Sequence, residues 1–210
     1  MFISFEGIDC SGKSTQIDLL AQRLEENGYE VLIVREPGGT PISERIRELL
    51  LDLRHREMDR HTELLLFSAS RSQLVTERIL PALHAGIVVI ADRFHDSTTA
   101  YQGYGRGLDI TSIEHVQNIA THQVYPDRSF FLDISVAESI ERRKLRLANV
   151  DRMEEADGAF FQRVRDGYLH IASTAPSRFR IIDGMRAPEP IAEEIWGWVV
   201  ANLPTAEGNH

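Results

Sequence analysis

The chain has 210 residues, a formal net charge of -9 and one cysteine, Cys10. This length predicts one domain over residues 1–210 with at most a small appended lid. The negative charge excludes a general nucleic-acid coat, and the absence of a long apolar run excludes insertion into a membrane. A lone cysteine excludes an internal disulfide and a cysteine-based zinc site. Because the first residues are typical of a strand and not of a signal peptide, we expect a cytoplasmic protein.

The predicted elements alternate between short apolar strands and longer amphipathic helices. We expect strands at residues 2–6, 30–35, 87–92, 129–133 and 179–183, and helices at 14–27, 41–53, 59–83, 97–101, 112–121, 136–146, 156–175 and 190–203. This order is typical of an α/β fold in which helices cover both faces of a parallel sheet. Pro81 is expected to kink or shorten the third helix. The glycine-rich run 103–107 predicts a flexible loop, and residues 147–157 predict a mobile flap.

Residues 7–14 directly follow the first predicted strand and match the phosphate-binding pattern G-x-x-x-x-G-K-[ST] in full. In such a P-loop, backbone amides and the start of the next helix bind phosphate oxygens. Lys13 is expected to bridge the β- and γ-phosphates of ATP, and the Ser14 hydroxyl to ligate Mg²⁺. A chance strand-to-helix turn is disfavoured because strand, loop and helix occur in the right order. The candidate nucleotide-binding residues are Gly7, Ile8, Asp9, Cys10, Ser11, Gly12, Lys13, Ser14 and Thr15.

A P-loop alone does not identify a reaction, because GTPases, ATPases and small-molecule kinases all contain one. The sequence lacks the Asn-Lys-x-Asp segment with which GTPases read guanine. A motor ATPase usually has a longer chain. A compact P-loop kinase is therefore the favoured class.

Two polar segments follow later strands, and we expect both at the same edge of the sheet as the P-loop. They are Arg-Glu-Pro-Gly-Gly-Thr at 35–40 and the Asp-Arg at 92–93 with Ser-x-x-Ala-Tyr-Gln-Gly at 97–103. With Phe5-Glu6 before the P-loop, these motifs make essentially the whole chain resemble the thymidylate kinase family. The resemblance implies a P-loop kinase fold with a five-stranded parallel sheet and a short lid, and a homodimer. It also implies the reaction of ATP with dTMP to give ADP and dTDP, a step of dTTP synthesis.

The resemblance assigns an acceptor site to the residues around the third helix. Phe67 and Arg71 lie four residues apart and share a helix face, where the family stacks an aromatic ring on thymine and reads its carbonyl with the arginine. Without the resemblance, Phe67 is better interpreted as core and Arg71 as a solvated charge. The other implied acceptor residues are Asp9, Glu36, Pro37, Arg93, Ser97, Thr98, Tyr101, Gln102 and Tyr168. In the family, the aromatic at position 101 crowds a 2′-hydroxyl.

Arg93 and Asp92 stand at the end of a strand that is expected to be buried. An unpaired charge is costly there, so Arg93 suggests a phosphate partner, and it resembles the family arginine that clamps the acceptor phosphate. The alternative in the empty enzyme is an ion pair of Arg93 with Asp9 or Glu36. Asp92 fits two interpretations equally, binding of Mg²⁺ through water or capping of the strand end.

Basic residues gather around the predicted lid, at about residues 145–157, in a chain that is acidic overall. Positions 10 and 11 carry no positive charge, so the chain resembles the bacterial-type branch in which lid arginines stabilise the transferring phosphate. Arg146 and Arg152 are therefore expected to be catalytic together with Lys13 and Arg93. Arg142 and Arg143 are expected to stack on adenine or to form surface pairs. The basic cluster comprises Arg142, Arg143, Lys144, Arg146 and Arg152.

Two other functions remain open at this point. Another deoxynucleotide or deoxynucleoside kinase would keep the P-loop, the Asp-Arg pair and the lid but change the residues that read the base. A non-catalytic nucleotide-binding regulator would bind ATP without turnover. The two acceptor loops and the lid make the second alternative less favoured.

Overall fold

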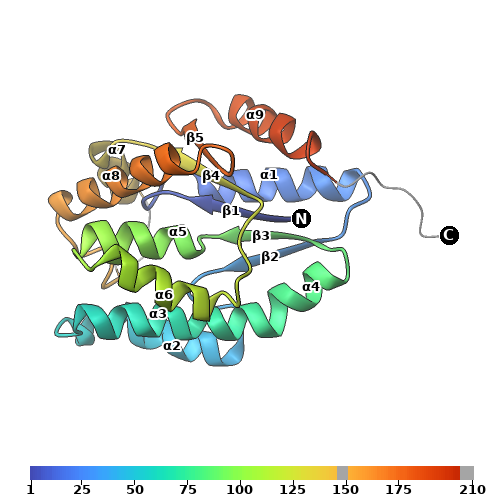
Figure 1. Ribbon diagram of the computed structural model, residues 1–210. Helices are drawn as coiled ribbons and strands as arrows, with labels where there is room; N and C mark the ends of the chain where they lie inside the picture. The colour runs from blue at the N-terminus through green and yellow to red at the C-terminus, as the bar shows by residue number, and fades with distance from the viewer. Residues whose placement is uncertain (146–150, 204–210) are drawn as a thin grey trace.

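The computed structural model describes residues 1–145 and 151–203, and its centre is a five-stranded parallel sheet (Figure 1). The order of the strands is β2-β3-β1-β4-β5, and every neighbouring pair is parallel. The predicted parallel α/β sheet is therefore confirmed. The strands are β1 (Phe2–Glu6), β2 (Val31–Arg35), β3 (Val88–Asp92), β4 (Arg128–Asp133) and β5 (Phe179–Asp183).

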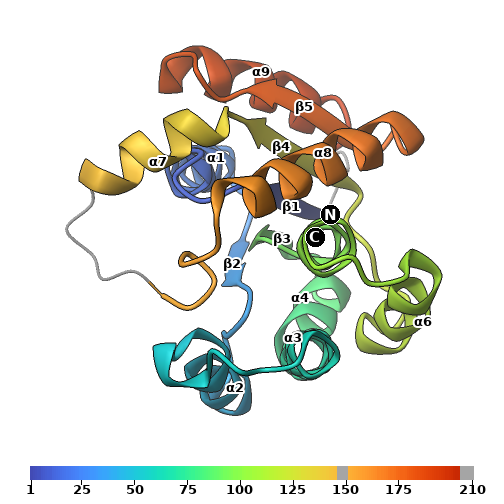
Figure 2. The same ribbon diagram turned by 90° about the vertical axis from the view of Figure 1, so that its left-hand side faces the viewer.

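Helices cover both faces of the sheet (Figure 2). Several begin at a side chain that accepts a backbone N–H, as Asp59 does for the third helix and Asp157 for the eighth. No helix in the described ranges is long and apolar enough to cross a membrane. The helices are α1 (Lys13–Glu26), α2 (Pro41–Leu51), α3 (Arg60–Leu74), α4 (Leu80–His84), α5 (His95–Thr98), α6 (Ile110–Ala120), α7 (Val136–Leu145), α8 (Gly158–Thr174) and α9 (Pro188–Val200), with a short 3₁₀ turn η1 (Leu53–His55) and π-helical segments η2 (Val75–Ile79) and η3 (Thr99–Gly105).

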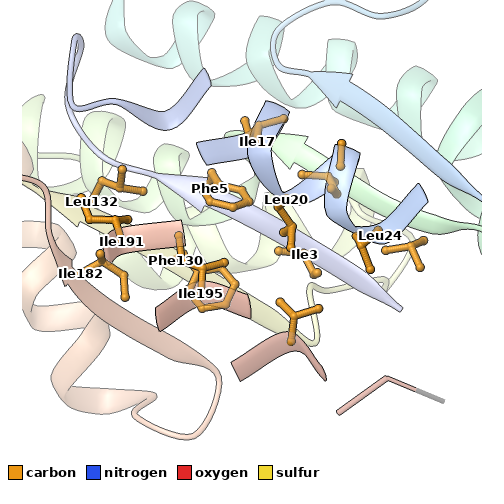
Figure 3. Packing of buried hydrophobic residues seen from close by; sticks show 14 residues of the cluster. Ile3, Phe5, Ile17, Leu20, Leu24, Phe130, Leu132, Ile182, Ile191 and Ile195 are labelled. Atoms are coloured by element: carbon orange, nitrogen blue, oxygen red, sulfur yellow. The ribbon is translucent and has the colours of Figure 1, made fainter. Parts of the chain in front are cut away.

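The core is divided by the sheet. Alternate residues of a strand point to opposite faces, so Ile3 and Phe5 pack with α1 and α9, whereas Phe2 packs with α3, η2 and α4. Figure 3 shows the first of these clusters, in which Leu20 and Ile195 meet the strands from two helices. Both faces are thus apolar. Because β1, β2 and β3 pair in parallel, their carboxyl ends lie at one edge of the sheet.

The predicted third helix is interrupted before Pro81. Proline has no backbone N–H and its ring crowds the preceding turn, so a regular helix cannot continue through it. The chain widens into η2, where the Leu80 N–H donates to the Val75 carbonyl, five residues back. The expected kink or shortening therefore takes the form of a π-helical segment followed by the short helix α4.

The expectation of a flexible loop at 103–107 is wrong for residues 103–105. They belong to η3, and Gly103 and Gly105 are buried. A Cβ on Gly105 would approach Phe160 Cε2 to 2.7 Å, and a Cβ on Gly167 of α8 would approach the Tyr104 Cβ to 2.8 Å. Glycine thus allows η3 and α8 to pack closely, a tertiary effect that local sequence does not reveal.

We predict that Gly167→Ala lowers the free energy of unfolding by about 1 to 3 kcal/mol, because its methyl group overlaps the Tyr104 ring. Gly197→Ala on α9 is the matched control, since a Cβ there meets no atom within 4 Å. It should raise stability by about 0.5 to 1 kcal/mol through helix propensity alone. Urea denaturation measures both, and equal effects would contradict the close packing of η3 on α8.

Candidate active site

A cavity of about 710 Å³ opens at the carboxyl ends of β1, β2 and β3. The P-loop, the loop after β2 and the turn after β3 all contribute to it, as the sheet topology predicts. Residues from α2, α3 and the segment after α7 complete the wall. The lining residues are Asp9, Cys10, Ser11, Gly12, Lys13, Ser14, Thr15, Arg35, Glu36, Pro37, Arg47, Leu51, Phe67, Arg71, Asp92, Arg93, Ser97, Thr98, Tyr101, Gln102, Asp151, Met153 and Glu154.

The P-loop has the backbone geometry of an anion site. Gly7 has φ 141°, and a Cβ there would meet the Leu132 carbonyl and the Ser11 hydroxyl, both at 2.8 Å. Helix α1 begins after Gly12 without a side-chain cap, so its first N–H groups remain available to a ligand. The Lys13 ammonium donates to the carbonyls of Gly7 at 3.3 Å and Ile8 at 3.2 Å. Burial is the main reason why the pKa of Lys13 is lowered.

Arg93 joins the turn after β3 to the P-loop. Its backbone has φ 69°, a left-handed conformation, and its Nη1 donates to the Gly7 carbonyl at 2.6 Å. Its Nη2 pairs with Asp9 Oδ1 at 2.7 Å. The ion pair of Arg93 with Asp9, which was the alternative to a phosphate partner, is therefore present in the structure. Although burial acts in the opposite direction, the charge of Arg93 holds the pKa of Asp9 below its ordinary value.

Glu6 holds the turn after β3 through hydrogen bonds to its side chain. Its side chain accepts hydrogen bonds from the Phe94 N–H at 2.9 Å, the Ser97 hydroxyl at 2.6 Å and the Tyr168 hydroxyl at 3.3 Å. Burial first, and then the charge of Asp96, raises the pKa of Glu6 to about 8. The sequence showed Glu6 only as part of a family motif. Its role as an acceptor for three neighbours follows from contacts across 88 to 162 residues.

Arg71 is 1% exposed, so the interpretation as a solvated charge is wrong. Its Nε donates to Glu36 Oε2 at 2.8 Å, and its Nη1 donates to the Thr98 hydroxyl at 2.9 Å. Burial raises the pKa of Glu36, and the charge of Arg71 opposes that effect. Phe67 is half-buried and lines the same cavity, so the two helix neighbours do face one space. Pro37 follows Glu36 through a cis peptide bond.

The residues proposed for Mg²⁺ fit a cation bound mainly through substrate phosphates. Asp92 and the exposed Ser14 both line the cavity. Oδ1 of Asp92 is buried and has no hydrogen-bond partner among the described residues, which favours a ligand over a strand cap. Over the same ranges, no group of three His, Cys, Asp or Glu side chains could hold a metal alone. This agrees with the preference of Mg²⁺ for one or two carboxylates with water and phosphate.

Some predicted site residues lie behind the cavity wall. Gly7 and Ile8 present carbonyls to Lys13, and Tyr168 is buried beneath Arg93 with its hydroxyl 2.7 Å from the Ser97 hydroxyl. Arg142 Nη1 donates to the Cys10 carbonyl at 3.4 Å from outside the loop. Arg152 is paired with Glu63 and is absent from the lining. Arg146 lies outside the described residues.

Several lining residues were not predicted as site residues. Arg35 ends β2, so its place at the carboxyl edge was a usable signal. Arg47 lies on α2, where its Nη1 donates to the Pro37 carbonyl at 2.9 Å, and no local pattern marks it. The others come from the end of α2 and from the chain before α8, which only the tertiary fold brings to the cavity. They are Leu51, Asp151, Met153 and Glu154.

Comparison with known proteins agrees with this geometry. The family model described as thymidylate kinase matches residues 5–195. The thymidylate kinase of Chlorobaculum parvum is 48% identical in an alignment of 203 positions that covers 93% of each chain, and that of Caldanaerobacter subterraneus is 49% identical over 88% of each chain. The crystal structure of thymidylate kinase from Ehrlichia chaffeensis has a TM-score of 0.76 and 38% identity, covering 94% of this chain and 97% of that one. Taken with the P-loop and the sheet order, these matches show that the chain has the P-loop kinase fold and belongs to the thymidylate kinase family.

Proposed function

We propose that this protein transfers the γ-phosphoryl group of ATP to dTMP, giving dTDP for dTTP synthesis, and that it uses Mg²⁺. The observation that carries the proposal is one cavity lined both by a P-loop with Lys13 and by Phe67 and Arg71, the two residues that we assign to the base. Arg93 contacts the P-loop and lies 5.0 Å from the Tyr101 ring centre, so it links the two ends.

At the donor end, the free N–H groups of the P-loop and of α1 bind the β- and γ-phosphates of ATP. Lys13 exchanges its two carbonyl partners for phosphate oxygens, which bind an ammonium more strongly. Arg142, which donates to the Cys10 carbonyl beside the loop, is the residue that we expect to stack on adenine. The remaining members of the nucleotide-binding set, Gly7 to Thr15, act through the loop backbone and the Ser14 hydroxyl.

At the acceptor end, Phe67 stacks on thymine and Arg71 donates to a thymine carbonyl. Glu36 fixes the Arg71 guanidinium in place, which reduces the entropy lost on binding. Arg93 clamps the acceptor phosphate, and Arg35 and Arg47 add positive charge to the same cavity. Tyr101 excludes a 2′-hydroxyl. Asp9, Pro37, Ser97, Thr98, Gln102 and Tyr168 complete the sugar and base surroundings.

Phosphoryl transfer then depends mainly on charge placed before the reaction. Lys13 and Arg93 stabilise the charge on the transferring group from the P-loop and from the acceptor side. Ser14 and Asp92 would hold Mg²⁺, which would neutralise phosphate charge when bound. The prediction that Arg146 adds a further positive charge stays a prediction from sequence.

We also propose that the chain is a single catalytic domain, acts in the cytoplasm and forms a homodimer. Leu65 on α3 and Ile119 on α6 are 58% and 76% exposed, and these two helices pack side by side. Apolar side chains so exposed are suited to a second copy of the chain.

Light scattering should give twice the mass of the chain, and Ile119→Lys should shift the measured mass toward that of the monomer. A monomer at micromolar concentration would contradict the homodimer.

We predict that the purified chain phosphorylates dTMP and, more weakly, dUMP, with ATP and Mg²⁺, but neither dCMP, dGMP nor thymidine. Lys13→Ala is the control, and it should lower kcat by about 100-fold or more while the fold stays intact, since the P-loop backbone still forms. A coupled assay of ADP release measures both. ATP binding without turnover on any acceptor would indicate a regulator, and a preference for dCMP or a nucleoside would indicate another kinase.

The raised pKa of Glu6 predicts a dependence of stability on pH. The ordinary pKa of 4.5 applies to the unfolded chain, and about 8 applies to the folded chain. Unfolding therefore releases a proton between these values, so the free energy of unfolding falls as the pH rises from 4.5 to about 8. Glu6→Gln removes this contribution. Urea denaturation at several pH values gives the free energy of unfolding as a function of pH. This free energy should fall less steeply with pH in Glu6→Gln than in the unmodified chain, by up to about 1.4 kcal/mol per pH unit. Equal pH dependences would contradict a neutral Glu6 in the folded chain.

A further inference from the structure

Glu63 is a buried carboxylate that the proposed reaction does not use. It lies in the first turn of α3 and is 1% exposed. Its Oε1 accepts from Gln102 Nε2 at 2.9 Å and Arg106 Nε at 3.1 Å. Its Oε2 accepts from Arg106 Nη2 at 3.2 Å and Arg152 Nη1 at 2.8 Å. One carboxylate thus joins α3 to two chain segments, the end of η3 and the segment at Arg152, whose residues lie 39 to 89 positions away in sequence.

Arg152 has its donors occupied by the protein. Besides Glu63, its Nε donates to the Leu50 carbonyl at 2.7 Å, and its backbone N–H donates to the Leu51 carbonyl at 3.1 Å. The side chain is 6% exposed. This arginine therefore ties its own segment to the end of α2 and to α3, and it does not reach toward the P-loop.

The segment that Arg152 holds forms part of the active-site cavity. We call residues 151–154 the wall segment, because Asp151, Met153 and Glu154 line the cavity beside Leu51. Asp151 Oδ1 closes a turn by accepting from the N–H groups of Met153 and Glu154, both at 2.9 Å. In Figure 2 this chain runs above α2 before α8 begins. Arg152 does not line the cavity, and its hydrogen bonds to Leu50 and Glu63 hold the lining residues on either side of it in the chain.

Glu63 also determines how Gln102 presents its amide. An ionised carboxylate only accepts hydrogen bonds, so the NH₂ of Gln102 must face Glu63, and the amide oxygen is left as an acceptor. Although burial acts in the opposite direction, the hydrogen bonds from Arg106, Gln102 and Arg152 hold the pKa of Glu63 below its ordinary value. Gln102 lines the cavity. An acceptor there matches the N3–H donor of thymine and not the N3 acceptor of cytosine.

We propose that Glu63 and Arg152 are positioning residues for the acceptor nucleotide: Glu63 orients the Gln102 amide and, through Arg152, fixes the wall segment against α2 and α3. This inference rests on the proposed function and deepens it. It gives Arg152 a role in binding dTMP, whereas the sequence-based expectation gave it a role in stabilising the transferring phosphate. A role in binding dTMP affects the KM for dTMP, whereas a role in stabilising the transferring phosphate affects kcat.

Arg152→Met tests the role directly, because it keeps the bulk of the side chain and leaves Glu63 paired with Arg106 and Gln102. We expect the KM and the calorimetric Kd for dTMP to rise about tenfold, the loss typical of a charged hydrogen bond, with kcat within about threefold and the KM for ATP unchanged. Glu155→Gln is the control, since it breaks the exposed Arg56–Glu155 pair in the same region and should change neither constant. A fall of about 100-fold in kcat with unchanged dTMP binding would overturn the proposal and support a phosphate-stabilising arginine.

Glu63→Gln tests the second half of the proposal. It allows the Gln102 amide to rotate, so the ratio of kcat/KM for dCMP to that for dTMP should rise about tenfold, whereas Arg152→Met should leave this ratio unchanged. The effects of the two substitutions on dTMP Kd should be less than additive, because both act through one contact. Additive effects, or an unchanged ratio in a folded Glu63→Gln variant, would overturn the proposal. Failure of the proposed function is distinct, because the unmodified chain would then neither bind nor turn over dTMP.

Discussion

Three buried or partly buried guanidinium groups around the active site are each paired with a carboxylate, and these pairs shape the site. Arg71 is paired with Glu36, Arg93 with Asp9, and Arg152 with Glu63. In each pair the two residues come from different elements. Removing one partner leaves an uncompensated buried charge, which typically costs about 3 to 5 kcal/mol. The pairs therefore fix the relative positions of the loop after β2, α3, the P-loop, the turn after β3 and the wall segment.

The hydrogen bonds of Lys13 and Arg93 also prepare the site for anionic ligands. Lys13 and Arg93 both donate to the carbonyl of Gly7, so their positive charges already lie beside the P-loop. A phosphate group replaces these weaker acceptors and needs little rearrangement of the chain. Preorganisation of this kind is what phosphoryl transfer requires, because its barrier is lowered mainly by charges that are already in place.

Features encoded by local patterns could be predicted from the sequence, and those encoded by long-range contacts could not. The five strands follow from short apolar runs, and the P-loop follows from eight consecutive positions. Helical spacing places Phe67 and Arg71 on one face, but their assignment to the acceptor site came from the family resemblance. By contrast, Glu63 meets Arg152 across 89 residues, and Arg47 meets Pro37 through the packing of α2. The π-helical segment η3 depends on glycines that let α8 approach, and its sequence alone resembled a loop.

Because α1 begins without a side-chain cap, a nucleotide bound there contributes to the free energy of unfolding. Gly12 supplies no side-chain oxygen, so the first turn of this helix lacks the acceptor that Asp59 or Asp157 gives to α3 or α8. A bound phosphate supplies that acceptor only when the chain is folded. By mass action, a nucleotide at 100 times its Kd stabilises the folded state by about 2.7 kcal/mol. The stability of the folded chain therefore depends on the concentration of the nucleotide that binds at this helix end.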